Sequence, residues 1–228
     1  MQERRRSQPR QAVEPTKEKI KVPAQYWEDL KRKDLAAVCR NAIAAEQPPE
    51  GLLLVFIGET ILIDLQGSVL KIGRQGRWEK VSYPLLELLS LVYLLKASPD
   101  ALNGEMVSVQ QLKTSHFFQG PHELNLDPLI RRFGNDAEGF KSAALNIGGE
   151  LQNLADASFK ILTFPKVPLY YLLWRGDEEF NPRLSVLFDG SIEKHLSADA
   201  IWGLVSLVSD ALLKGSVPPF QDATVPHS

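Results

Sequence analysis

The chain has 228 residues, of which 44% are apolar, and a formal net charge of −2. This composition excludes a wholly disordered protein, and it argues against a general nucleic-acid binder, which needs a surplus of Lys and Arg. The single cysteine, Cys39, excludes an intrachain disulfide and a cysteine-only metal cluster within one chain.

The first 21 residues differ from the rest because they hold seven Lys or Arg against three Glu. No apolar segment follows this basic start, so a signal peptide is not indicated. We predict a disordered basic leader at 1–24, one domain at 25–215 and a flexible C-terminal tail at 216–228. The alternative for the leader is an electrostatic arm for nucleic acid or anionic lipid.

The first half of the domain favours a helix followed by an antiparallel meander. Apolar spacing between residues 24 and 46 predicts an amphipathic helix with a break near Lys33 and Asp34. Two β-rich runs, 52–57 and 60–65, flank Gly58-Glu59, which predicts a hairpin with a type II′ turn. Residues 69–72 are expected to form a third strand.

The second half predicts helices and then strands. The stretch "PLLELLSLVYLLKA" is expected to be a core helix, since it is shorter than the roughly 20 residues that span a bilayer. The further expected elements are a strand entering a helical turn at 105–112, helices at 126–134 and 135–149, strands at 158–164, 167–174 and 183–189, and a helix at 197–215. Asn135 is the expected N-cap of the helix at 135–149. This grouping predicts an α+β fold in which a mixed or antiparallel sheet packs with helices in a single domain.

The familiar motifs for dinucleotides, nucleoside triphosphates, esterases and zinc proteases are absent from the sequence. One candidate site is "HFFQGPHEL", which contains His116, His122 and Glu123. Two imidazoles and a carboxylate can ligate a divalent metal, with His116 and His122 as the expected ligands. The alternative is a packed loop whose phenylalanines fill the core while the histidines make ordinary hydrogen bonds.

The second candidate lies in "WRGDEEFNPRLSVLFDGSIEKH", with Asp177, Glu179, Asp189 and His195 as potential ligand-binding groups. If the strands on either side of "RGDEEFNP" pair, Asp177 and Asp189 lie at opposite ends of the second strand. A single acidic pocket would then require a bend. The alternative is that these carboxylates are solvated turn residues.

Three segments, "HFFQGPHEL", "LDPLIRRFGNDAEGFKSAALNIGGE" and the run from "FPKVPLYYLLWRGDEEF" to "EKHLSADAIWGL", resemble the uncharacterised prokaryotic family known as domain of unknown function 3786. The resemblance covers most of residues 27–214. It implies a cytoplasmic protein of an anaerobic bacterium and suggests a metallocofactor or corrinoid protein as partner. Some similar proteins carry an iron–sulfur segment ahead of this domain, and the single cysteine here puts a redox role in doubt.

Two functions from different classes follow as expectations. The first is a non-catalytic ligand- or partner-binding accessory module of anaerobic metabolism. The second is a metal-dependent enzyme, or a protein that handles a corrinoid or tetrapyrrole metallocofactor. Its ligands would be His116, His122 and His195, with Glu123, Glu179 or Asp189 as a further ligand or general base. The second function requires at least three of the candidate side chains to converge on one point.

Overall fold

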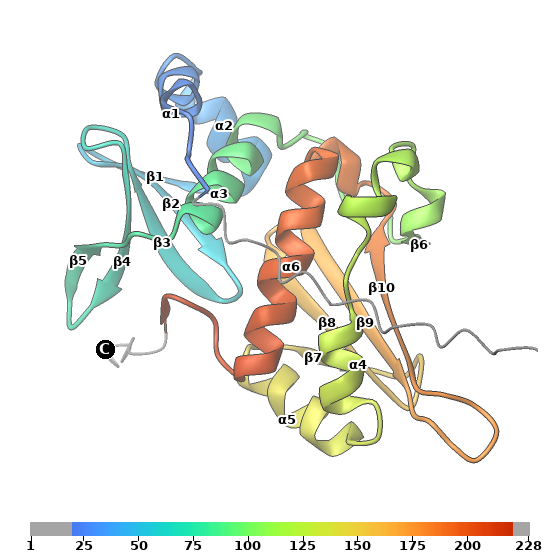
Figure 1. Cartoon of the computed structure of the whole chain (residues 1–228). Helices are drawn as coiled ribbons and strands as arrows, with labels where there is room; N and C mark the ends of the chain where they lie inside the picture. Colours follow the sequence, from blue (N-terminus) through green and yellow to red (C-terminus); the bar gives the residue numbers. More distant parts are fainter. Residues whose placement is uncertain (1–19, 221–228) are drawn as a thin grey trace, which may run out of the picture.

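The computed structural model describes residues 20–220, and every structural statement below refers to that part of the chain. Residues 1–19 of the predicted leader and residues 221–228 of the predicted tail lie outside it. The described helices are α1 (Ala24–Lys31), α2 (Leu35–Ala42), α3 (Pro84–Lys96), α4 (Asp127–Phe133), α5 (Ala137–Asn146) and α6 (Ala198–Lys214). The described strands are β1 (Ala45–Gln47), β2 (Gly51–Phe56), β3 (Glu59–Asp64), β4 (Val69–Arg74), β5 (Arg77–Lys80), β6 (Met106–Ser108), β7 (Glu150–Gln152), β8 (Ala157–Phe164), β9 (Val167–Trp174) and β10 (Arg183–Asp189). Figure 1 shows their arrangement.

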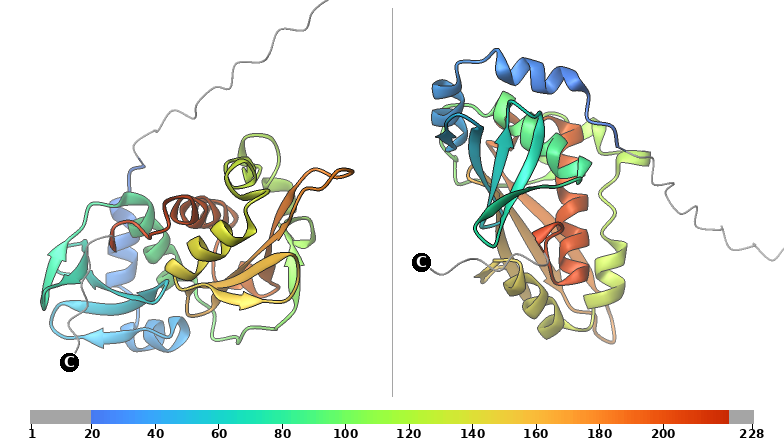
Figure 2. Two further views of the ribbon diagram at one scale, coloured as in Figure 1. Left: turned by 90° about the horizontal axis from the view of Figure 1, so that it is seen from below. Right: turned by 90° about the vertical axis from the view of Figure 1, so that its left-hand side faces the viewer.

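The strands form two five-stranded antiparallel sheets. The first is a meander in the order β1-β2-β3-β4-β5, and the second has the order β6-β10-β9-β8-β7. In the second sheet β9 lies at the centre, and its apolar residues are almost all buried. Helices α4, α5 and α6 cover one side of this sheet (Figure 2). These observations confirm the predicted α+β fold.

One continuous hydrophobic core joins the two sheets. Phe56 at the end of β2 lies 5.0 Å, ring centre to ring centre, from Phe164 of β8. Tyr93 of α3 stacks on the same Phe164 at 4.6 Å. Because the sheets share these side chains, neither sheet has a separate core. None of the helices between residues 20 and 220 has both the length and the apolar character needed to cross a bilayer.

The β2–β3 hairpin turns one residue earlier than predicted. Phe56 pairs with Glu59, so the central turn residues are Ile57 and Gly58, with φ angles of 46° and 77°. Two positive angles are typical of a type I′ turn, so the predicted type II′ turn is wrong. Ile57 adopts this conformation because its side chain is buried and its N–H donates to the Thr163 carbonyl at 2.9 Å.

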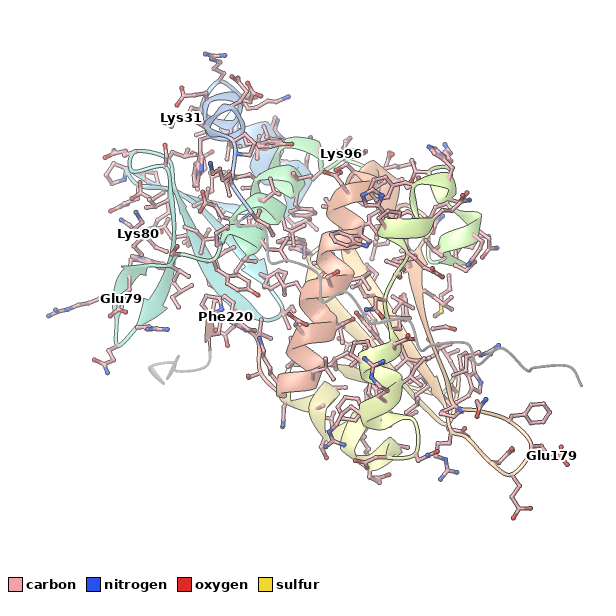
Figure 3. The ribbon with its side chains drawn as sticks, viewed as in Figure 1. Lys31, Glu79, Lys80, Lys96, Glu179 and Phe220 are labelled. Carbon is pink, nitrogen blue, oxygen red and sulfur yellow. The ribbon has the colours of Figure 1, made fainter. Side chains whose placement is uncertain are left out.

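Two further features differ from the predictions. The short strands β1, β5 and β7 were not expected. The N-cap of α5 is Asp136, whose carboxylate accepts from the Gly139 N–H at 2.8 Å, so the assignment to Asn135 is wrong. Helix α6 ends at Gly215 as expected, and the following residues pack against the body, with Val217 and Phe220 buried (Figure 3).

Candidate functional site

Two segments organise the end of the second sheet where β10 finishes. We call Ala97–Glu105, which leads from α3 to β6, the strap, and Asp189–Leu196, which leads from β10 to α6, the clasp. Figure 2 shows the strap crossing the side of the sheet opposite α4, α5 and α6. Every second residue of the clasp has a polar side chain that binds another segment or the clasp itself, namely Asp189, Ser191, Glu193 and His195. The clasp therefore holds the strap and the loop that follows β6.

Asp189 fastens the C-terminal part of the strap. Its carboxylate, which is 2% exposed, accepts from the main-chain N–H groups of Asn103 at 3.1 Å and Gly104 at 2.8 Å. The Ser191 N–H and hydroxyl donate to it as well. Burial by itself raises the pKa of Asp189, but these hydrogen bonds outweigh burial and hold the pKa below its ordinary value. This carboxylate is fully occupied within the fold.

Lys166 fastens the N-terminal part of the strap. It lies in the tight β8–β9 turn and is buried, and its ammonium donates to the carbonyls of Ser98, Pro99 and Asp100 at 2.9, 3.3 and 3.1 Å. Three carbonyls therefore use all three donors of the ammonium. On the adjacent face, the Ser98 N–H donates to Nδ1 of His195 at 3.3 Å.

His195 is fully buried, and its Nε2 has no hydrogen-bond partner among the described residues. Because Nδ1 accepts a hydrogen bond, the neutral ring carries its proton on Nε2. Burial and the nearby Lys166 ammonium lower the pKa of His195, against the opposing effect of Asp189 and Asp100. His195 is therefore held neutral as part of the packing.

The lowered pKa of His195 predicts a loss of stability in mild acid. The unfolded chain binds a proton near pH 6.5 but the folded chain does not, so the free energy of unfolding should fall as pH drops below about 6.5. For this one proton the slope cannot exceed about 1.4 kcal/mol per pH unit. Urea unfolding between pH 7.5 and 5.5 measures it. The slope should vanish in His195→Gln and persist in the matched control His116→Gln, because His116 is exposed.

Glu193 holds the loop that contains "HFFQGPHEL". Its carboxylate accepts from the main-chain N–H groups of Lys113 and Thr114, both at 2.9 Å, and from the Thr114 hydroxyl. Burial raises the pKa of Glu193, but these hydrogen bonds outweigh burial and lower the pKa overall. The clasp thus sets the position of the loop as well as that of the strap.

The loop itself packs on α6 through aromatic rings. His122 stacks on Phe117 at 4.4 Å and meets Trp202 of α6 edge-on at 6.0 Å. The Trp202 indole N–H donates to the Glu123 carbonyl at 3.4 Å, and both His116 and His122 are exposed. Phe118 supplies the buried ring of this loop, whereas His122 is exposed and contacts Phe117 and Trp202 through its ring.

A groove lies between this loop and β10. Its volume is about 240 Å³. We call it the β10 groove, and its lining residues are Ser108, Val109, Gln110, Phe118, Glu123, Leu124, Leu126 and Leu184–Leu187. A second, separate hollow of about 330 Å³ shares Val109, Gln110 and Phe118 with it, so the two adjoin. Of the predicted site residues, only Glu123 lines the β10 groove.

The acidic residues of the second candidate are separated. Asp177 and Glu179 precede β10 and Asp189 ends it, so the length of the strand, about 20 Å, lies between them. Glu179 points away from the body at the tip of this hairpin (Figure 3). Asp177 is exposed and accepts from the Glu179 and Phe180 N–H groups of its own turn. It also lines a separate shallow hollow with Asn135, Asp156, Arg175 and Gly176.

The candidate metal ligands are distributed over different surroundings. His122 packs against Phe117 and Trp202, and His195 lies beneath the strap. Within residues 20–220, no three His, Cys, Asp or Glu side chains are grouped so that they could hold a metal ion. The convergence that the enzyme hypothesis requires is therefore not seen in this part of the chain.

The family model for a domain of unknown function, DUF3786, matches residues 34–211, which is more than three quarters of the chain. The chain belongs to the DUF3786 family. The match begins at Asp34, the N-cap of α2, and ends within α6, so it includes both sheets, the strap, the clasp and the β10 groove. No curated protein and no solved structure matches the chain.

Sequence reasoning missed several residues that shape this region of the DUF3786 protein. Lys166 stands between two prolines in "FPKVP", a context that gives no sign of burial. Glu193 lies in an ordinary turn sequence, and Trp202 reads as part of an amphipathic helix. One signal was present: "EMVSVQQL" predicted a short strand that runs into a helical turn, and a strand that ends early can leave part of its neighbour's edge unpaired.

Proposed function

We propose that this DUF3786 protein is a non-catalytic accessory module that binds a partner protein in the β10 groove. The observation that carries the proposal is a hollow bordered by part of a strand that no other described strand covers. Asp189 and His195, the buried polar groups predicted as functional, are engaged in fastening the strap. Their contacts support a structural role, which leaves the groove as the better candidate for binding.

The groove is mixed in character, as protein-binding surfaces commonly are. Phe118, Leu124 and Leu126 give it apolar walls, and Gln110 and Glu123 give it polar ones. Its volume is below the range of about 300–1,000 Å³ typical of small-molecule sites. A short polypeptide segment lying partly outside the hollow suits these dimensions better than an enclosed organic ligand does.

The family resemblance suggests where the partner belongs. It associates the domain with metallocofactor or corrinoid proteins of anaerobic bacteria. We therefore propose that the accessory module acts in anaerobic metabolism. The alternative, a metal-dependent enzyme or a metallocofactor handler, would require a ligand set that residues 20–220 do not assemble. Metal analysis of protein purified anaerobically without a histidine tag distinguishes the two: we expect far less than one metal per chain.

Site-specific photo-cross-linking in the native cells tests the proposal. A benzophenone amino acid replaces Gln110, which is exposed and lines the groove, and Arg77 on β5 of the first sheet serves as the matched exposed control. We expect one discrete cross-linked protein from position 110 and none from position 77. The same pattern at both positions, or no product at position 110, would contradict a partner site in the β10 groove.

A further inference from the structure

The groove borders an uncovered part of a strand edge. Strand β6 pairs only with Leu187, Phe188 and Asp189, the last three residues of β10. Arg183–Val186 pair with β9 on one side, and no described strand pairs with them on the other. Figure 1 shows β6 beside only the upper part of β10. More than half of β10 is therefore an open edge.

The direction of the free main-chain groups follows from one hydrogen bond. The Gly190 N–H donates to the Glu105 carbonyl at 2.9 Å, so the main-chain groups of residue 190 face the β6 side. These groups alternate in direction along an antiparallel strand. Those of Leu184 and Val186 therefore face the same side, where β6 has ended. Two N–H groups and two carbonyls are presented to the groove, while both side chains are buried in the core.

The surroundings of this edge select a single strand as occupant. The loop residues Phe118, Glu123, Leu124 and Leu126 form a wall along the groove, so the edge lies in a recess. A flat edge of another sheet, such as β10 of a second copy, would meet that wall. A single extended segment fits between the wall and β10, and its main chain supplies the donors and acceptors that the edge lacks.

The charge of the groove points to the composition of the segment. Glu123 is the only charged side chain among the lining residues. Its carboxylate makes no hydrogen bond or ion pair with any residue in 20–220, and the contact of Glu123 with α6 is made by its main-chain carbonyl. A Lys or Arg in the bound segment would meet an unneutralised carboxylate at the rim.

Resting on the proposed function, we infer that the partner presents an extended segment that adds to β10 as a strand. It lies in line with β6 and antiparallel to β10, so that the ladder between β6 and β10 continues. Its main chain pairs with Val186 and Leu184, and a basic side chain lies near Glu123. The adjoining hollow, where Gln119 and Ser115 join Gln110 and Phe118, accommodates one further side chain.

The test uses the full-length protein and a library of acetylated, amidated hexapeptides composed of Val, Thr, Phe and Lys. The tightest binder is resynthesised in two further forms, one with alternate N-methylated amides and one with Gln in place of Lys. N-methylation removes main-chain donors without changing side chains, so binding should weaken at least about tenfold if strand pairing holds the peptide. The Gln form should bind about threefold more weakly, and this difference should disappear in Glu123→Gln.

Amide hydrogen exchange locates the complex without any substitution. Bound peptide should slow exchange at Val186 and Leu184 and leave β5 unchanged. Strand addition would be overturned if no peptide binds, if the N-methylated form binds with equal affinity, or if the peptide protects amides elsewhere. It would also be overturned if light scattering shows a dimer and the amides of Leu184 and Val186 are protected in it. The two proposals can fail separately. If a partner is cross-linked at position 110 but no peptide binds, the proposed function stands and strand addition fails. If a peptide binds but no cellular partner is cross-linked, strand addition stands and the proposed function fails.

Discussion

Replacing Lys166 by methionine is expected to lower the free energy of unfolding by about 3 kcal/mol, because three strap carbonyls lose a charged donor in a buried place. Methionine keeps most of the chain length and removes the ammonium, so the change isolates the hydrogen bonds from packing. Urea unfolding at pH 7.5 measures the effect. Hydrogen exchange at Asn103 and Gly104 should also become faster, because the strap loses its N-terminal attachment.

Lys160→Met is the matched control for this substitution. Lys160 lies on β8 of the same sheet and pairs with the exposed Glu150 at 3.0 Å. An ion pair of this kind contributes at most about 1 kcal/mol. Equal losses in the two variants would mean that the contacts of Lys166 with the strap contribute nothing special to stability.

Asp189→Asn should be destabilising by about 2–4 kcal/mol, although the side chain keeps its size. The carboxylate accepts hydrogen bonds from strap N–H groups through both of its oxygens. An amide has only one oxygen, so its NH₂ group must face either the Gly104 N–H or the donors on the other side. Two donors then oppose each other in a buried place. Thermal and urea unfolding measure the loss.

Acid unfolding gives a second readout for Asp189. Its pKa is lowered in the folded state, so its stabilisation is complete above about pH 4 and is lost as pH falls through the folded-state value. The wild-type protein should therefore lose stability in this acid range, and Asp189→Asn should lack that component. Asp177→Asn is the matched control, because Asp177 accepts two N–H groups in an exposed turn. A smaller effect is expected there, and an equal one would contradict the role of burial.

Both substitutions bear on the groove as well as on stability. Gly104 and Glu105 lead directly into β6, and Ser108, the last residue of β6, lines the groove beside the open part of β10. A loosened strap should let β6 fray and displace Ser108 from the groove wall, so peptide affinity should fall in Lys166→Met even at temperatures where the protein stays folded. This dependence connects the attachment of the strap with the exposed edge.

The local pattern of the sequence determined most of the elements and the fold class. Pro84 began α3, Gly215 ended α6, and the runs "SFKILTF", "VPLYYLLW" and "RLSVLFD" became the strands β8, β9 and β10. These signals are local because capping, proline geometry and side-chain alternation act within a few residues. The family resemblance was also contained in the sequence, and the match to residues 34–211 confirms it.

Tertiary contacts decided the rest. Ile57 takes a positive φ because the second sheet binds its N–H and buries its side chain. The residues next to Ile57 in the sequence do not predict that contact. Lys166 and Ser98 are 68 positions apart in the chain, so their hydrogen bond depends on how the strap crosses the sheet. The candidate residues Asp177 and Asp189 look alike in sequence, yet one is solvated and the other buried. Hydrophobic pattern reports which face is buried, but only the folded chain determines which polar groups are brought together and which strand edge is left uncovered.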